Sequence, residues 1–116
     1  MEMQTKKIFQ PSVLLVEDEQ IVQKVHRNLL EKIGCRVDVA ENGETALAKL
    51  NNKYDLIFMD IMMPGINGYD AARMIRSFED EQRMKTHTVI IAVTAKQNKG
   101  EYEEAIKAGM DDYLTK

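Results

Sequence analysis

A run of apolar residues that ends abruptly on a carboxylate constrains this chain most. Residues 56–59 are all apolar, and Asp60 follows them at once. A run without polar alternation is typical of a strand buried on both faces in the middle of a parallel sheet. Pro64, Gly65 and Gly68 stop the strand and force a turn, so Asp60 is expected at its carboxyl end, where open α/β sheets form their binding crevice. Taken alone, Asp60 is equally compatible with a residue that only caps a turn.

The rest of the chain alternates between strand-like and helix-like segments. Further strands are predicted over residues 12–16, 36–40, 88–93 and 112–116. Apolar positions at helical spacing predict helices over residues 20–33, 43–50, 67–78 and 101–108. The charged residues 79–86 are expected to form a solvated loop. Strands and helices that alternate with short connections predict parallel strands joined by right-handed crossovers, which is a doubly wound α/β sandwich.

Composition and charge exclude several classes of function. The 116 residues are 44% hydrophobic and 30% charged, as expected of one soluble domain. The formal net charge of -3 argues against direct binding to nucleic acid, which needs a basic patch. The apolar runs are too short to cross a bilayer and no signal peptide is evident, so we expect a cytoplasmic protein without membrane contact. Residues 1–10 are expected to form a flexible leader and residues 11–116 one domain.

The polar residues that follow the predicted strands are expected to meet at one edge of the sheet. These residues are Glu17, Asp18, Asp60, Thr94 and Lys116. Three carboxylates a few ångströms apart repel one another, and a hard cation with oxygen ligands relieves the repulsion. Mg²⁺ fits this description and commonly bridges carboxylates to a phosphate, so Lys116 and the Thr94 hydroxyl would face phosphoryl oxygens. Asp60, at the centre, is the natural nucleophile for an aspartyl phosphate.

Four motifs carry a resemblance to a known family. They occupy residues 16–19, 59–68, 93–95 and 108–116. In this order and spacing they resemble the response-regulator receiver domain of two-component signalling, and the likeness runs from about Pro11 to the last residue. Residues 90–95 and 109–116 are most similar to receivers attached to hybrid sensor histidine kinases.

The resemblance implies a flavodoxin-like fold with a five-stranded sheet in the order 2-1-3-4-5. It implies phosphorylation of Asp60 by a histidine kinase or a histidine phosphotransfer protein, as one step of a signal relay. The implied cofactor is Mg²⁺, bound by Asp18 and Asp60, by the backbone carbonyl of Met62, and by Glu17 directly or through water.

The resemblance also implies roles for residues on the later strands. Thr94 and Lys116 would assist the phosphoryl transfer. Thr94 and Tyr113 match the family's switch pair, in which the hydroxyl moves toward the phosphoryl group and the aromatic ring turns inward. The chain would promote only its own phosphorylation and dephosphorylation, so it is not an ordinary enzyme, although its parent protein would be a histidine kinase.

Two departures from the family pattern lead to expectations. Receivers normally continue past Lys116 with a proline and a fifth helix, so a C-terminally truncated domain is expected, with an exposed apolar patch that favours a homodimer. Met62 stands two residues after Asp60. Its apolar side chain cannot orient an attacking water, which predicts slow loss of the phosphoryl group.

Other functions fit the same residues less well. A flavin-binding relative of the fold would need a phosphate cradle where residues 17–19 are all acidic, and these would repel the phosphate. A phosphatase with an aspartyl nucleophile typically has a second acid two residues after it. Met62 stands at that position here, so this class of enzyme is disfavoured. Two alternatives stay open, a degenerate receiver that acts only as a protein interaction module and a stand-alone single-domain response regulator.

Overall fold

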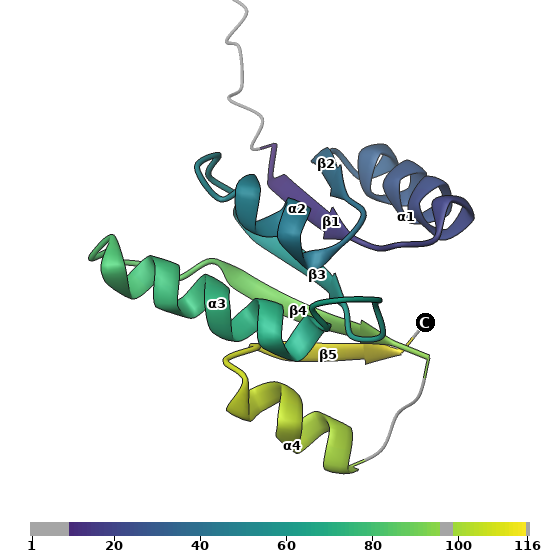
Figure 1. Cartoon of the computed structure of the whole chain (residues 1–116). Helices are drawn as coiled ribbons and strands as arrows, with labels where there is room; N and C mark the ends of the chain where they lie inside the picture. Colours follow the sequence, from purple (N-terminus) through teal and green to yellow (C-terminus); the bar gives the residue numbers. More distant parts are fainter. Residues whose placement is uncertain (1–9, 96–98, 116) are drawn as a thin grey trace, which may run out of the picture.

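Five parallel strands form the centre of the molecule, in the order β2-β1-β3-β4-β5 (Figure 1). The computed structural model describes residues 10–95 and 99–115, so most of the expected leader lies outside the described residues. The strands are β1 Ser12–Val16, β2 Arg36–Ala40, β3 Leu56–Asp60, β4 Val89–Thr94 and β5 Asp112–Thr115. This confirms the doubly wound α/β fold and the strand order expected from the sequence.

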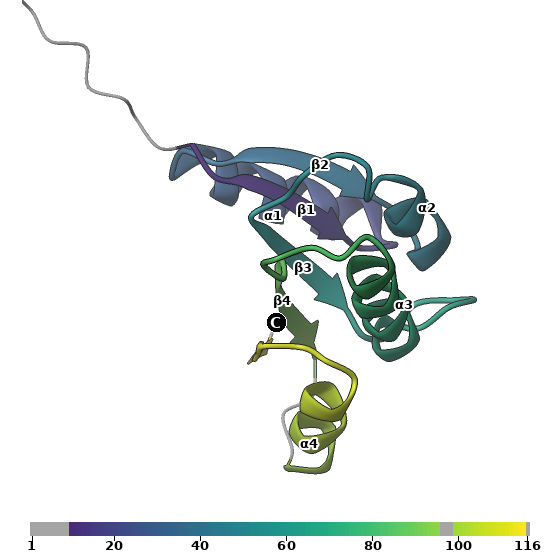
Figure 2. The ribbon, with the colours of Figure 1, turned by 90° about the vertical axis from the view of Figure 1, so that its left-hand side faces the viewer.

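Helices cover both faces of the sheet. They are α1 Gln20–Lys32, α2 Gly43–Ala48, α3 Gly68–Glu81 and α4 Lys99–Lys107. Figure 2 shows α1 on one side of the sheet, and α2 and α3 on the other. The side chains of Asn42 and Asn67 cap α2 and α3 by accepting the backbone N–H of Thr45 at 2.8 Å and of Asp70 at 2.9 Å. These caps satisfy N–H groups that lack a partner within the helix, and they fix where each helix begins.

The core lies between the central strands and α3. Leu14, Ile57 and Ile90 are neighbours across β1, β3 and β4, and none of them is accessible to solvent. Ile75 of α3 is also buried within this core cluster. Complete burial of such a side chain stabilises the fold by about 1.5–3 kcal/mol. The central strands are therefore firmly held, and so are the residues at their carboxyl ends.

One predicted loop is wrong at its beginning. Helix α3 continues to Glu81, so residues 79–81 are helical, and Glu79 is only 2% exposed. Its carboxylate accepts Nη1 of Arg76 at 2.7 Å and the backbone N–H of Thr88 at 2.7 Å, and it contacts Nδ1 of His87 at 2.9 Å. A charge can be buried when partners of this kind replace its hydration. The run of charged residues predicted a solvated loop. The local sequence pattern does not show the partners of Glu79, because they come from other parts of the chain.

An apolar row on α1 faces outward. Ile21, Val25 and Leu29 are 79%, 51% and 58% exposed, although their spacing suggests a buried helix face. An open apolar groove of about 240 Å³ lies beside this row, and Phe58, Leu114 and other residues line it. The described part of the chain therefore exposes an apolar patch, formed by this row and the groove. No helix in the described part of the chain has the length and apolar character that crossing a bilayer requires.

Candidate functional site

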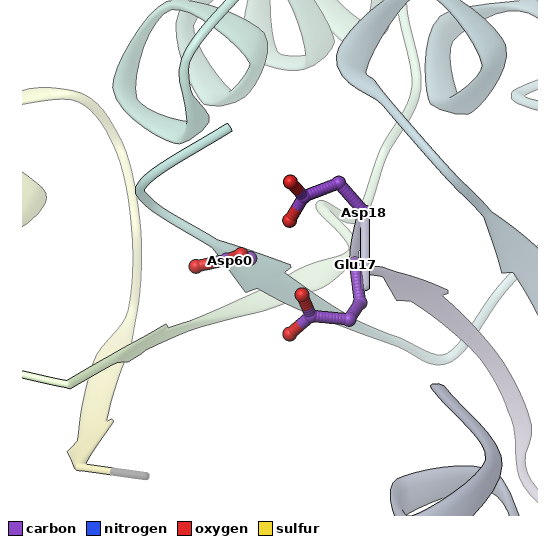
Figure 3. A group of neighbouring side chains, drawn as sticks. All are labelled: Glu17, Asp18 and Asp60. Atoms are coloured by element: carbon purple, nitrogen blue, oxygen red, sulfur yellow. The ribbon is translucent and has the colours of Figure 1, made fainter. Parts of the chain in front are cut away.

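Three carboxylates gather where β1 and β3 end. Glu17 and Asp18 directly follow β1, and Asp60 is the last residue of β3. These strands are neighbours, with Val16 opposite Met59, so their carboxyl ends lie side by side. One carboxylate oxygen from each of the three acids lies within 4.8 Å of the other two (Figure 3). The predicted meeting of these three residues is therefore confirmed.

Two of the three carboxylates are withdrawn from water. Glu17 is 2% exposed and Asp60 3% exposed, whereas Asp18 is more accessible. Backbone N–H groups orient the buried pair: Glu19 donates to Oε2 of Glu17 at 3.2 Å, and Met62 donates to Oδ1 of Asp60 at 3.2 Å. Three carboxylates this close to one another repel each other. The arrangement therefore favours a bound cation.

The donor set fits a hard divalent cation. All three side chains offer oxygen, which is the ligand atom that Mg²⁺ prefers, and Asp18 leaves the cluster accessible from solvent. The hydrogen bond from the Met62 N–H to Oδ1 of Asp60 holds the backbone that follows β3 near the carboxylates. Mg²⁺ bound there would offset the crowded negative charge.

Two further predicted site residues, Thr94 and Tyr113, stand on β4 and β5. Thr94 ends β4 and is 2% exposed, and it lies one residue beyond Val93, the neighbour of Asp60 across the sheet. Thr94 therefore belongs to the same edge as the carboxylates. Tyr113 points its hydroxyl to α4, where it donates to Oε2 of Glu101 at 2.9 Å. Lys116 lies outside the described residues, and its predicted role stays a prediction.

Gly68 packs against the backbone of the site, although the sequence predicts only a turn there. Its N–H donates to the carbonyl of Ile61 at 3.0 Å, at the first turn of α3. A Cβ at this position would lie 2.5 Å from the carbonyl oxygen of Asp60 and 2.8 Å from Cα of Ile61. Helix α3 can approach the backbone of Asp60 this closely only because residue 68 has no side chain. The sequence shows the glycine but not the backbone against which it packs.

Fold and site together define a class of protein. It is a doubly wound α/β domain with an acidic, cation-accepting cluster at the carboxyl edge of its sheet. The family model of the response regulator receiver domain matches residues 13–116. The chain belongs to the response regulator receiver domain family.

Individual relatives agree with this assignment. The chain is 40% identical over 105 residues to the transcriptional regulatory protein ResD of Bacillus subtilis, which covers 90% of this chain and 41% of ResD. Its structure is similar to the receiver domain of the sensor histidine kinase PA1611 from Pseudomonas aeruginosa, solved with a magnesium ion in its active site cleft. That match has a TM-score of 0.79 and 38% identity, and it covers 93% of this chain and 86% of that one.

A third similar structure contains a partner protein. It is the complex of the Saccharomyces cerevisiae histidine phosphotransfer protein Ypd1 with the receiver domain of Ssk1. The match has a TM-score of 0.85 and 34% identity, with coverage of 95% of this chain and 81% of that one. The chain spans 41% of the length of ResD and between 6% and 15% of the length of similar histidine kinases.

Proposed function

We propose that this receiver accepts a phosphoryl group on Asp60 from a phosphohistidine and passes the signal on by a change of conformation. The observation that carries the proposal is the set of three carboxylate oxygens within 4.8 Å of one another at the carboxyl edge of a receiver fold. Asp60 is the member of this set that ends the central strand β3, between β1 and β4.

In the proposed reaction a carboxylate oxygen of Asp60 attacks the phosphorus of the phosphohistidine. The new P–O bond forms as the P–N bond breaks, and the histidine nitrogen leaves with the bonding electron pair. The N–H of Met62, 3.2 Å from Oδ1 of Asp60, orients the carboxylate for attack. The buried setting of Asp60 excludes competing water from the reacting oxygen.

Residues around Asp60 would stabilise the transferred group. Asp18 and Glu17, with the Met62 carbonyl, would hold Mg²⁺ against the phosphoryl oxygens, as the acidic donor set supports. The Thr94 hydroxyl would donate to a phosphoryl oxygen, and Lys116 would pair with its charge.

The conformational response would involve Thr94 and Tyr113. A dianion on Asp60 attracts the Thr94 hydroxyl, and the vacated space admits the Tyr113 ring. The change would alter the surface formed by α4 and β5, since the Tyr113 hydroxyl donates to Glu101 of α4. This surface would then be read by the next protein in the relay.

Partners follow from the chemistry of the donor. A histidine kinase or a histidine phosphotransfer protein would supply the phosphoryl group, which is supported by the receiver complex with Ypd1. The histidine kinases among the relatives favour a hybrid sensor kinase as the parent protein of this receiver. The similarity to ResD favours a separate response regulator. Homodimer formation and a cytoplasmic location remain predictions.

The test is to incubate the protein with Mg²⁺ and a small acyl phosphate and then to measure its intact mass. One added phosphoryl group is expected, and it should be absent in Asp60→Asn and when Mg²⁺ is chelated. Asp18→Asn should slow the reaction strongly, because it removes a metal ligand. Asp80→Asn, which changes an exposed acid of α3, should react like the wild type. No addition in the wild type would favour the degenerate receiver, which acts only through protein contacts.

A further inference from the structure

Two consecutive residues of α4 hold the ring of Tyr113. Its hydroxyl donates to Oε2 of Glu101 at 2.9 Å. The ring of Tyr102 meets the ring of Tyr113 edge to face, with centroids 6.0 Å apart and an interplanar angle of 85°. Tyr113 is thereby fixed at its hydroxyl by a carboxylate and at its ring by an aromatic edge.

Helix α4 is itself fastened to α3. Arg73 of α3 donates to Oε1 of Glu104 at 2.9 Å, and the Tyr69 hydroxyl lies 3.5 Å from the backbone carbonyl of Glu101. Burial and the negative charge of Glu101 raise the pKa of Tyr69, which agrees with this proximity. Glu101 is therefore held in place between α3 and β5. It can anchor Tyr113 instead of following the ring when the ring moves.

We propose that Glu101 is a positioning residue that keeps the Tyr113 phenol on α4 and so sets the resting state of the receiver. The inference rests on the proposed function, in which Tyr113 turns inward when Asp60 is phosphorylated. A hydrogen bond from a hydroxyl to a carboxylate is among the stronger ones in proteins. In the proposed switch the phenol leaves Glu101 as the ring turns toward Thr94, so this bond opposes the phosphorylated state.

The consequence for the phosphorylation site follows from linkage. A contact made only in the resting state lowers the affinity of the site for any ligand that needs the switched state. Beryllofluoride, which mimics a phosphoryl group on aspartate, is such a ligand. Removal of the Glu101 carboxylate should therefore tighten beryllofluoride binding at Asp60, although Glu101 lies on α4 and Asp60 on β3.

The experiment measures beryllofluoride affinity in the presence of Mg²⁺, by calorimetry, in the wild type and three variants. Glu101→Ala removes the acceptor, and Tyr113→Phe removes the donor while it keeps the ring. Both are expected to tighten binding about fivefold, as the loss of one half-exposed hydrogen bond to a charge would allow. The double variant should bind no more tightly than either single one, because both changes break the same bond.

Two further variants separate positioning from a general effect of charge. Glu103→Ala removes the same charge from an exposed site two residues along α4, and its affinity should equal that of the wild type. Glu101→Gln keeps a neutral acceptor. Its affinity for beryllofluoride should lie between that of the wild type and that of Glu101→Ala. Equal effects of Glu101→Ala and Glu103→Ala, or effects that multiply in the double variant, would overturn the proposal.

A second readout does not depend on phosphorylation. The unfolding free energies of the wild type, Glu101→Ala, Tyr113→Phe and the double variant, measured in urea without beryllofluoride, form a thermodynamic cycle. The two losses should be less than additive if the hydrogen bond exists in solution, and additive losses would contradict it. Failure of the wild type to bind beryllofluoride at all would contradict the proposed function instead, even where the cycle shows the coupling.

Discussion

Arg76 and Asp111 are paired at 2.7 Å, although 35 residues separate them in the chain. The same guanidinium donates to the carbonyl of Gly109 at 2.9 Å and to that of Thr88 at 2.7 Å. Arg76 thus joins α3 to the start of β4 and to the turn between α4 and β5. All these contacts lie at the amino edge of the sheet, opposite the carboxylate cluster. The contacts of Arg76 stabilise the amino edge of the sheet, and the carboxylate cluster lies at the carboxyl edge.

Removal of Arg76 should destabilise the domain strongly. In Arg76→Leu the buried carboxylate of Glu79 loses the partner that lies 2.7 Å away, and a buried charge without its partner costs about 3–5 kcal/mol. The unfolding free energy from urea titration measures this loss. Arg73→Leu is the matched control on the same helix, because its ion pairs with Asp70 and Glu104 are about half exposed. That change should cost less than about 1 kcal/mol, and equal losses would contradict the assignment.

Glu79 should make the stability of the domain depend on pH. Burial alone would raise the pKa of Glu79, but the bonds from the Thr88 N–H, Arg76 and His87 outweigh it and lower the pKa below 4.5. A carboxyl with a lowered folded pKa stabilises the fold above its unfolded pKa. This contribution is lost as the pH falls through the folded pKa.

The variant Glu79→Gln tests this dependence. The difference in unfolding free energy between the wild type and Glu79→Gln should be largest near pH 7 and should shrink below pH 4.5. Glu81→Gln, at an exposed site of the same helix, should show no such change. A difference that does not vary with pH would mean that the pKa of Glu79 is the same in the folded and unfolded states.

A methyl group on Gly68 should disturb the site directly. In Gly68→Ala the new Cβ would meet the Asp60 carbonyl oxygen at 2.5 Å, so α3 or the end of β3 has to shift. We expect a loss of about 1–3 kcal/mol in stability, as overpacking produces, together with slower phosphorylation of Asp60. Urea titration and the rate of mass gain with an acyl phosphate measure the two effects.

Gly34→Ala is the control for Gly68→Ala. Gly34 has a φ of 101° and no neighbour within 4 Å of a Cβ, and it precedes β2 at the other edge of the sheet. Its substitution should cost about 1 kcal/mol through backbone strain and leave the phosphorylation rate unchanged. A phosphorylation rate in Gly68→Ala that matches this control would show that α3 can retreat without moving Asp60.

Met62 should set the lifetime of the phosphoryl group. Its side chain is 75% exposed, while its backbone N–H is bonded to Asp60. Met62→Asn places an amide there that can orient an attacking water, and hydrolysis should accelerate about tenfold, the effect of one favourable hydrogen bond. The decay of the phosphorylated mass after removal of the donor measures the lifetime. Met62→Leu should decay like the wild type, and equal lifetimes in all three proteins would refute the role.

The sequence by itself determined the alternation of strands and helices and the three acids of the site, and the family resemblance supplied the sheet order. This was achievable because Glu17, Asp18 and Asp60 each follow a continuous apolar run, and parallel strands bring their carboxyl ends to one edge. A pattern within a few residues was enough. The family resemblance added Met62 and Tyr113 to the site, since no spacing pointed to them.

Only the tertiary structure decided which charges are buried and which apolar residues stay outside. Glu79 looked like a loop residue, and Ile21 looked like a core residue, yet they are 2% and 79% exposed. Burial of a charge depends on partners such as Arg76 and Thr88, which fold onto it from other elements. The contact between Gly68 and Asp60, and that between Glu101 and Tyr113, likewise arise where distant segments pack. Local periodicity carries no information about such pairs, because their energy exists only after the chain has folded.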